Sequence, residues 1–182
     1  MSVVDPLLAN ADEAPPLRWS QRWRALVSAR RAGSLPLHCL MAVPAALLPS
    51  AAFFLLARAV ASALGLDVAA LSPPQRETTL DQFFGAVVFA PVVETLLLML
   101  LLRGLVIVMR RPVRVAAVSA VVWGVLHGLQ GPLWFFGTAW SFYIFSASYQ
   151  AWRPVSRRHA FAAAAVPHAA INLVAMLSLL LP

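Results

Sequence analysis

The chain has 182 residues, of which 61% are hydrophobic and 12% are charged, and its formal net charge is +7. This composition leaves too little polar surface to solvate a globular domain of that size, so it predicts a small membrane domain. Every basic residue is an arginine, and most arginines lie in short clusters beside apolar runs, which is typical of membrane orientation and argues against a nucleic-acid partner.

Residues 1–35 are predicted to form a cytoplasmic tail followed by an interfacial helix. Within 16–33, the side chains of Trp19, Trp23 and Leu26 share one helical face with arginines around them. That pattern is typical of a helix that lies on an anionic membrane surface. The segment has no apolar core of the kind found in a secretory signal.

Residues 36–182 are predicted to form one all-α, polytopic transmembrane domain. The apolar run from Phe83 to Leu102 is decisive, because about 20 apolar residues at 1.5 Å per residue cross a hydrocarbon core of about 30 Å. The single cysteine, Cys39, excludes an intrachain disulfide. About five spans are expected in total, at roughly 37–64, 82–109, 114–129, 133–151 and 160–181.

Arginines in the connecting segments predict the orientation of these spans. Five arginines precede the first span, three lie within 110–114 and three within 153–158, whereas the alternate loops carry no positive excess. Loops rich in arginine stay in the cytoplasm. We therefore expect a multi-pass protein of the cell (inner) membrane with its N-terminus in the cytoplasm and its C-terminus outside.

Four polar side chains are predicted to lie at one depth, near the middle of the membrane. Glu94 interrupts the apolar run, and a buried carboxylate is costly unless it is protonated or finds donors. His127, His168 and Asn172 stand about 15 to 21 Å above the arginine-marked edge on two other spans. Since His168 and Asn172 are four residues apart, they share one helical face. We expect these four side chains to converge.

Other polar and aromatic residues have simpler interpretations. A single membrane histidine often bonds a neighbouring carbonyl group, and a single asparagine often joins two helices. His38 and His159 lie beside basic loops and are predicted to be solvated. A packing surface and interfacial belt, rather than a ligand site, is the favoured interpretation of Trp134, Phe135, Phe136, Trp140, Phe142, Tyr143 and Phe145.

Three short motifs occur in order on the polar-bearing spans: ETLLLM at 94–99, WGVLH at 123–127 and HAAIN at 168–172. They resemble the Glu-Glu-x-x-x-Arg, aromatic-x-x-x-His and His-x-x-x-Asn motifs of the CAAX-protease and bacteriocin-processing (CPBP, also called Abi) intramembrane proteases. The resemblance covers roughly residues 82–177. It implies a helical membrane bundle and a glutamic peptidase whose catalytic residues are Glu94, His127, His168 and Asn172.

The first motif departs from the family pattern. Thr95 stands where the family has a second glutamate, and Met99 stands where it has an arginine. Those two family residues would form a buried ion pair, and losing both leaves no orphan charge. Arg103 lies one turn beyond Met99, so a supporting role is expected for it, together with Thr95 and with Trp123 of the second motif.

The resulting prediction is an intramembrane endopeptidase that acts on a membrane-associated peptide or protein and contacts membrane lipid. Glu94 is expected to deprotonate a water held by His127, while His168 and Asn172 donate to the oxyanion. No cofactor is expected. The alternative is a zinc ion held by Glu94, His127 and His168, because two histidines and one glutamate are a valid catalytic zinc set.

Two other classes of function use the same residues. A non-catalytic membrane binding or immunity protein would keep the fold with a decayed first motif. A proton-linked transporter would relay protons through Glu94 and the histidines, but five spans without an internal repeat argue against it.

Overall fold

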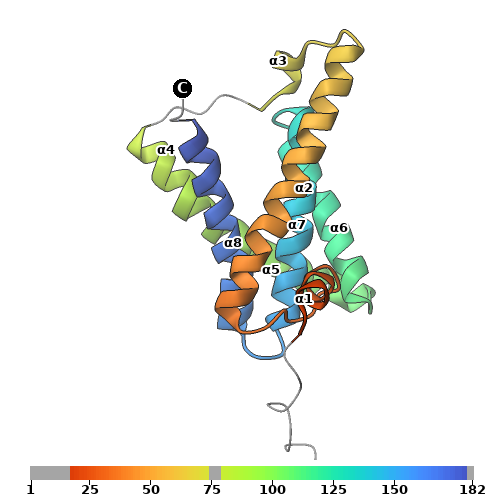
Figure 1. The fold of residues 1–182 in the computed structure, drawn as a ribbon, viewed down its shortest axis with the longest axis vertical. Helices are drawn as coiled ribbons and strands as arrows, with labels where there is room; N and C mark the ends of the chain where they lie inside the picture. Colours follow the sequence, from red (N-terminus) through yellow and green to blue (C-terminus); the bar gives the residue numbers. More distant parts are fainter. Residues whose placement is uncertain (1–16, 74–78, 180–182) are drawn as a thin grey trace, which may run out of the picture.

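The computed structural model describes residues 17–73 and 79–179, and every regular element within those ranges is helical (Figure 1). The predicted all-α fold is therefore confirmed. The elements in chain order are α1 (Trp19–Val27), α2 (Leu35–Ala63), α3 (Val68–Leu71), α4 (Leu80–Phe84), the π-helical turn η1 (Gly85–Phe89), α5 (Ala90–Val108), α6 (Pro112–Gly128), α7 (Pro132–Trp152) and α8 (Arg157–Ser178).

Three helical stretches of the described chain are long and apolar enough to cross a membrane: α2, the continuous stretch Leu80–Val108 and α8. The helix α6 is also apolar but has only 17 residues. The fourth predicted span, 133–151, corresponds to α7, which is not among the three and which buries several serines inside the bundle. Each predicted range coincides with a helix to within a few residues.

The central element of the bundle is α7, which packs against α2, α6 and α8 (Figure 1). Its buried face carries Ile144, Phe145 and Tyr149. Two buried pairs of hydroxyl groups join it to its neighbours: Ser50 and Ser141 lie 2.8 Å apart, and Ser146 donates to Ser119 over 2.9 Å. Small hydroxyl residues let helices approach closely and satisfy each other's hydrogen bonds in apolar surroundings.

The two ends of the bundle differ in charge. The lower end in Figure 1 holds α1, the α5–α6 turn and the α7–α8 turn, which are the three arginine-rich segments. The opposite end holds α3, the α6–α7 turn and the end of α8. The arginine clusters, which are far apart in the sequence, thus gather on one side.

The N-terminal region differs from prediction in two respects. Within α1, Leu26 is fully buried against the bundle, whereas Trp19 and Trp23 stay exposed, so the predicted apolar face is divided between protein and exterior. The expectation that His38 is solvated is wrong. Its ring is fully buried, its Nδ1 accepts a hydrogen bond from the Ala32 amide over 3.1 Å, and its edge meets Trp152, because the 28–34 loop folds over the start of α2. The tail, residues 1–16, lies outside the described residues.

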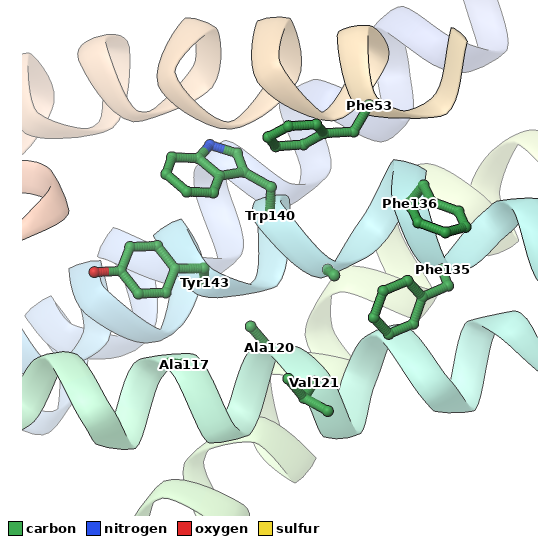
Figure 2. Close-up of a pocket in the computed structure, with 9 residues that line it drawn as sticks. Phe53, Ala117, Ala120, Val121, Phe135, Phe136, Trp140 and Tyr143 are labelled. Atoms are coloured by element: carbon green, nitrogen blue, oxygen red, sulfur yellow. The ribbon is translucent and has the colours of Figure 1, made fainter. Parts of the chain in front are cut away.

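The aromatic residues of α7 face two different directions. Phe135, Phe136, Trp140 and Tyr143 line an apolar groove of about 300 Å³ between α2, α6 and α7 (Figure 2). Trp134, Phe142 and Phe145 instead line a larger cavity on another side of the helix. The first four side chains thus lie on an apolar surface between helices, which fits the predicted packing surface, whereas the other three line a cavity.

Close approach of α6 and α7 depends on Gly124. A Cβ added there would lie 2.9 Å from both Ala139 Cβ and the ring of Phe135. We predict that Gly124→Ala lowers the free energy of unfolding by about 1 to 3 kcal/mol, measured by thermal unfolding in detergent. Gly104→Ala in α5 is the matched control, because nothing lies within 4 Å of its new Cβ; it should be neutral or slightly stabilising. Equal effects of the two changes would contradict the packing.

Candidate functional site

The segment that carries Glu94 is a helix with a π-helical turn inserted before it. Thr79 caps α4 by accepting from the Gln82 amide, and η1 then follows before α5 begins at Ala90. Pro91 falls in the first turn of α5, which continues from η1 without a break in the helical backbone. Such π-helical turns often occur at functional sites. The sequence did not predict this turn.

Glu94 lies beside two histidines that come from different helices. Its Oε2 atom is 3.8 Å from His127 Nε2 of α6 and 3.6 Å from His168 Nε2 of α8. The glutamate side chain is 24% exposed, whereas the histidine side chains are 12% and 7% exposed. The structure therefore brings together three of the four predicted residues, with a partly accessible carboxylate between two nearly buried imidazoles.

The orientation of the His127 ring follows from a backbone contact. Its Nδ1 lies 2.9 Å from the carbonyl oxygen of Trp123, one turn earlier on α6. Because a carbonyl oxygen only accepts, Nδ1 must carry the hydrogen, and a neutral ring then presents an unprotonated Nε2 to Glu94. The first and last residues of the WGVLH motif are thus joined by one hydrogen bond.

Aromatic rings hold both histidines in place. His168 stacks on Phe145 with ring centroids 4.8 Å apart and meets the edge of Phe142 at 5.4 Å. Phe142 also contacts His127 at 5.2 Å and stacks on Trp123 at 4.6 Å. The roles of Phe142 and Phe145 were missed in the sequence, although their i, i+3 spacing already placed them on one face of the central span.

Asn172, the fourth predicted residue, faces the same cavity but is already engaged. Its Nδ2 donates to the carbonyl oxygen of Ala86 in η1 over 2.8 Å. The cavity has a volume of about 1050 Å³ and is lined by Glu94, His127, His168 and Asn172. Arg58 of α2 lines the cavity too.

The three predicted supporting residues lie in different surroundings. Trp123 is buried and contacts the site through Phe142 and His127. Thr95 is buried on the stripe of α5 that faces the core, with Leu98 and Leu102. Arg103 is exposed and is not among the residues that line the cavity. The geometry therefore favours a supporting role for Trp123 most directly.

Carboxylate and imidazole groups are metal ligands, so their spacing bears on whether a metal could bind. Within residues 17–73 and 79–179, no group of three or more His, Cys, Asp or Glu side chains is arranged to hold a metal ion. The polar atoms around Glu94 are instead spaced at 3.6 to 3.8 Å, a separation at which a water can join two groups.

A protein-family model, described as type II CAAX prenyl endopeptidase Rce1-like, matches residues 76–174, more than half of the chain. The chain belongs to the Rce1-like family. The resemblance seen in the three motifs is thereby confirmed, and Rce1-like membership together with the apolar helices makes this chain a membrane protein of a protease family. No curated protein and no solved structure is found to match the chain.

The altered first motif of this Rce1-like chain generates a prediction about stability. Met99 is half-buried and packs against the core, and Thr95 lies one turn before it in a fully buried position. Met99→Arg alone would place a cation there with no second glutamate to meet it, so we expect a clear loss of folded protein. Adding Thr95→Glu should recover folded protein, because glutamate and arginine meet at this i, i+4 spacing.

Yield and thermal stability in detergent measure both variants of the first motif. Met99→Leu is the matched control, since it keeps volume and polarity and should change stability little. Equal yields of the single Met99→Arg and the double variant would mean that position 99 does not correspond to the family's arginine.

Proposed function

We propose that the chain is an intramembrane endopeptidase of the glutamic type, with Glu94 as its general base. The observation that carries this proposal is the position of the Glu94 carboxylate between His127 and His168 in one cavity. The Rce1-like membership supports peptide hydrolysis as the reaction class.

The proposed reaction begins with a water molecule between Glu94 and His127. The bond from His127 Nδ1 to Trp123 leaves Nε2 as an acceptor, so this nitrogen orients the water while the carboxylate removes its proton. The hydroxide formed attacks the carbonyl carbon of the scissile peptide bond. Glu94, now protonated, then delivers its proton to the departing amine nitrogen, so that the carboxylate is regenerated.

The negative charge on the tetrahedral intermediate needs hydrogen-bond donors. His168 supplies one in the tautomer that carries hydrogen on Nε2, the atom that faces Glu94. The side-chain amide of Asn172 has two hydrogens, of which one is used by Ala86, and the other is available for the oxyanion. The rings of Phe142 and Phe145 lie against His168 and limit the access of water to this donor, which strengthens its effect.

The substrate is proposed to enter from the end of the bundle opposite the arginine clusters. Besides the site itself, the cavity is lined by Arg58 of α2, by Val68 and Ser72 around α3, and by Leu179 after α8. These residues belong to α3 or lie at or near the C-terminal ends of α2 and α8, and these parts of the chain are at that end of the bundle (Figure 1). If arginine-rich loops stay in the cytoplasm, the mouth opens outside. Accordingly, we propose that the substrate is a membrane-associated peptide or protein and that it is cleaved near the outer surface of the cell membrane. We also propose that residues 36–182 form one protease domain.

A first test replaces the proposed base. Glu94→Gln keeps the size of the side chain but cannot take a proton, so the cleavage rate should fall by about 10²-fold to 10⁴-fold. Mass spectrometry identifies the products, by comparing peptide termini in membranes from cells that express the wild type or the variant. Thermal unfolding controls for fold.

A chelator distinguishes the two enzyme types. A glutamic enzyme keeps its activity with a chelator present, whereas a zinc enzyme loses it. An unchanged phenotype of Glu94→Gln would favour a non-catalytic binding or immunity protein.

A second test measures orientation. With Cys39 replaced by serine, single cysteines at positions 70 and 182 should react with a membrane-impermeant thiol reagent added outside, because those segments are proposed to be external. Cysteines at positions 112 and 155 should react only after the membrane is opened. The reverse labelling pattern would overturn both the orientation and the proposed side of substrate entry.

A further inference from the structure

The backbone of η1 receives one hydrogen bond from a side chain on a distant helix. Nδ2 of Asn172 donates to the carbonyl oxygen of Ala86 over 2.8 Å, across 86 positions of the sequence. Ala86 is buried, and η1 packs against α8. Inside a membrane, a backbone carbonyl without a donor is costly, so this bond needs a structural reason.

The reason lies in Pro91. In η1 each amide bonds five residues back, as the Ala90 amide does to the carbonyl of Gly85. The next amide in this register would be that of residue 91, and its acceptor would be Ala86. Residue 91 is proline, which has no amide hydrogen, and it is fully buried. Asn172 supplies the hydrogen that Pro91 lacks.

A second proline in the same protein is compensated in the same way. Pro49 lies inside α2, where the amide of residue 49 would serve the carbonyl of Ala45 in a regular α-helix. Trp140 Nε1 of α7 donates to that carbonyl instead, over 2.8 Å. The fold therefore uses side chains of neighbouring helices to satisfy carbonyls that prolines leave open.

The bond to Ala86 bears on the position of Glu94. If the π-helical turn changed to α-helical spacing, the segment on one side would rotate by about 100° about the helix axis relative to the other. Glu94 lies only one turn after Pro91, so its carboxylate would turn relative to α8. On α8, His168 sits one turn before Asn172 and faces that carboxylate at 3.6 Å. Helix α8 thus contacts both the Glu94 carboxylate and η1, the turn that sets the direction of this carboxylate.

We propose that Pro91 and Asn172 form a positioning pair. Pro91 leaves the Ala86 carbonyl without an amide donor, and Asn172 supplies that donor, which fixes the rotation of α5 and the direction of Glu94. Asn172 is then a positioning residue in addition to any hydrogen that it gives to an oxyanion. The catalytic consequence rests on the proposed function, whereas the pairing itself does not.

The pairing is tested by a double-mutant cycle on thermal unfolding of the full chain in detergent. Asn172→Ala should lower the melting temperature by about 2 to 4 °C, the effect of losing one hydrogen bond in a protein of this size. In a Pro91→Ala background the same change should cost clearly less, because residue 91 then has its own amide hydrogen. Pro49→Ala is the matched control background, in which the cost of Asn172→Ala should stay unchanged. An equal cost in the wild-type and Pro91→Ala backgrounds would overturn the proposal.

Hydrogen exchange gives a second reading if Pro91→Ala yields too little protein. In the wild type, amides of the peptide spanning residues 83–92 should exchange at least fivefold more slowly than in Asn172→Ala. Peptides from α6 serve as the internal reference, and their exchange should not change. Equal exchange of the 83–92 peptide in both proteins would overturn the proposal.

Activity separates this proposal from the proposed function. On a reporter peptide that carries a cleavage site identified as above, Pro91→Ala should raise kcat of the Asn172→Ala variant at least tenfold with little change in KM. If Glu94→Gln stays active while the melting temperatures are coupled, the proposed function fails and the positioning pair stands. If Glu94→Gln is inactive while the temperatures are additive, the pair fails and the enzyme stands.

Discussion

A carboxylate in the apolar part of a membrane bundle is the constraint on which the rest of the site depends. Glu94 sits in an otherwise apolar helix, and its charge is tolerable only with polar groups close by. His168 of α8 can meet this need through a hydrogen on Nε2, 3.6 Å from the carboxylate, and His127 of α6, at 3.8 Å, can share a water with it. The rings of Phe142 and Phe145 and the hydrogen bond from Asn172 to Ala86 help to keep α6 and α8 beside α5.

The order of the helices explains why three motifs far apart in the sequence meet. The central helix α7 carries no predicted catalytic residue, yet its Phe142 touches both histidine rings. It packs against α6 on one side and α8 on the other, so it sets the distance between the two histidines. The buried serine pairs and Gly124 permit these close approaches.

Much of this arrangement could be read from the sequence, for identifiable reasons. The length of an apolar run predicts a membrane-spanning helix, and the arginine clusters predict which way each helix runs. Both signals arise because polar backbone and charged side chains are costly to bury in lipid. The shared depth of Glu94, His127 and His168 follows from the rise per residue of a helix. The π-helical turn could not be predicted, since it depends on how η1 packs against α8. His38 was also mispredicted, because a basic loop beside a histidine does not reveal that the loop folds back over it.

The two contacts that α8 makes through His168 and Asn172 also bear on how the protein responds to bilayer thickness. Residues four apart on a helix differ in height by about 6 Å, so one contact to the carboxylate and one to the backbone of η1 fix α8 along its axis as well as around it. A thicker or thinner membrane acts on the ends of helices and is usually accommodated by tilt. In this bundle such tilting would change the width of the cavity near Leu179, one of its lining residues, while the contacts of α8 hold the carboxylate level with its histidines.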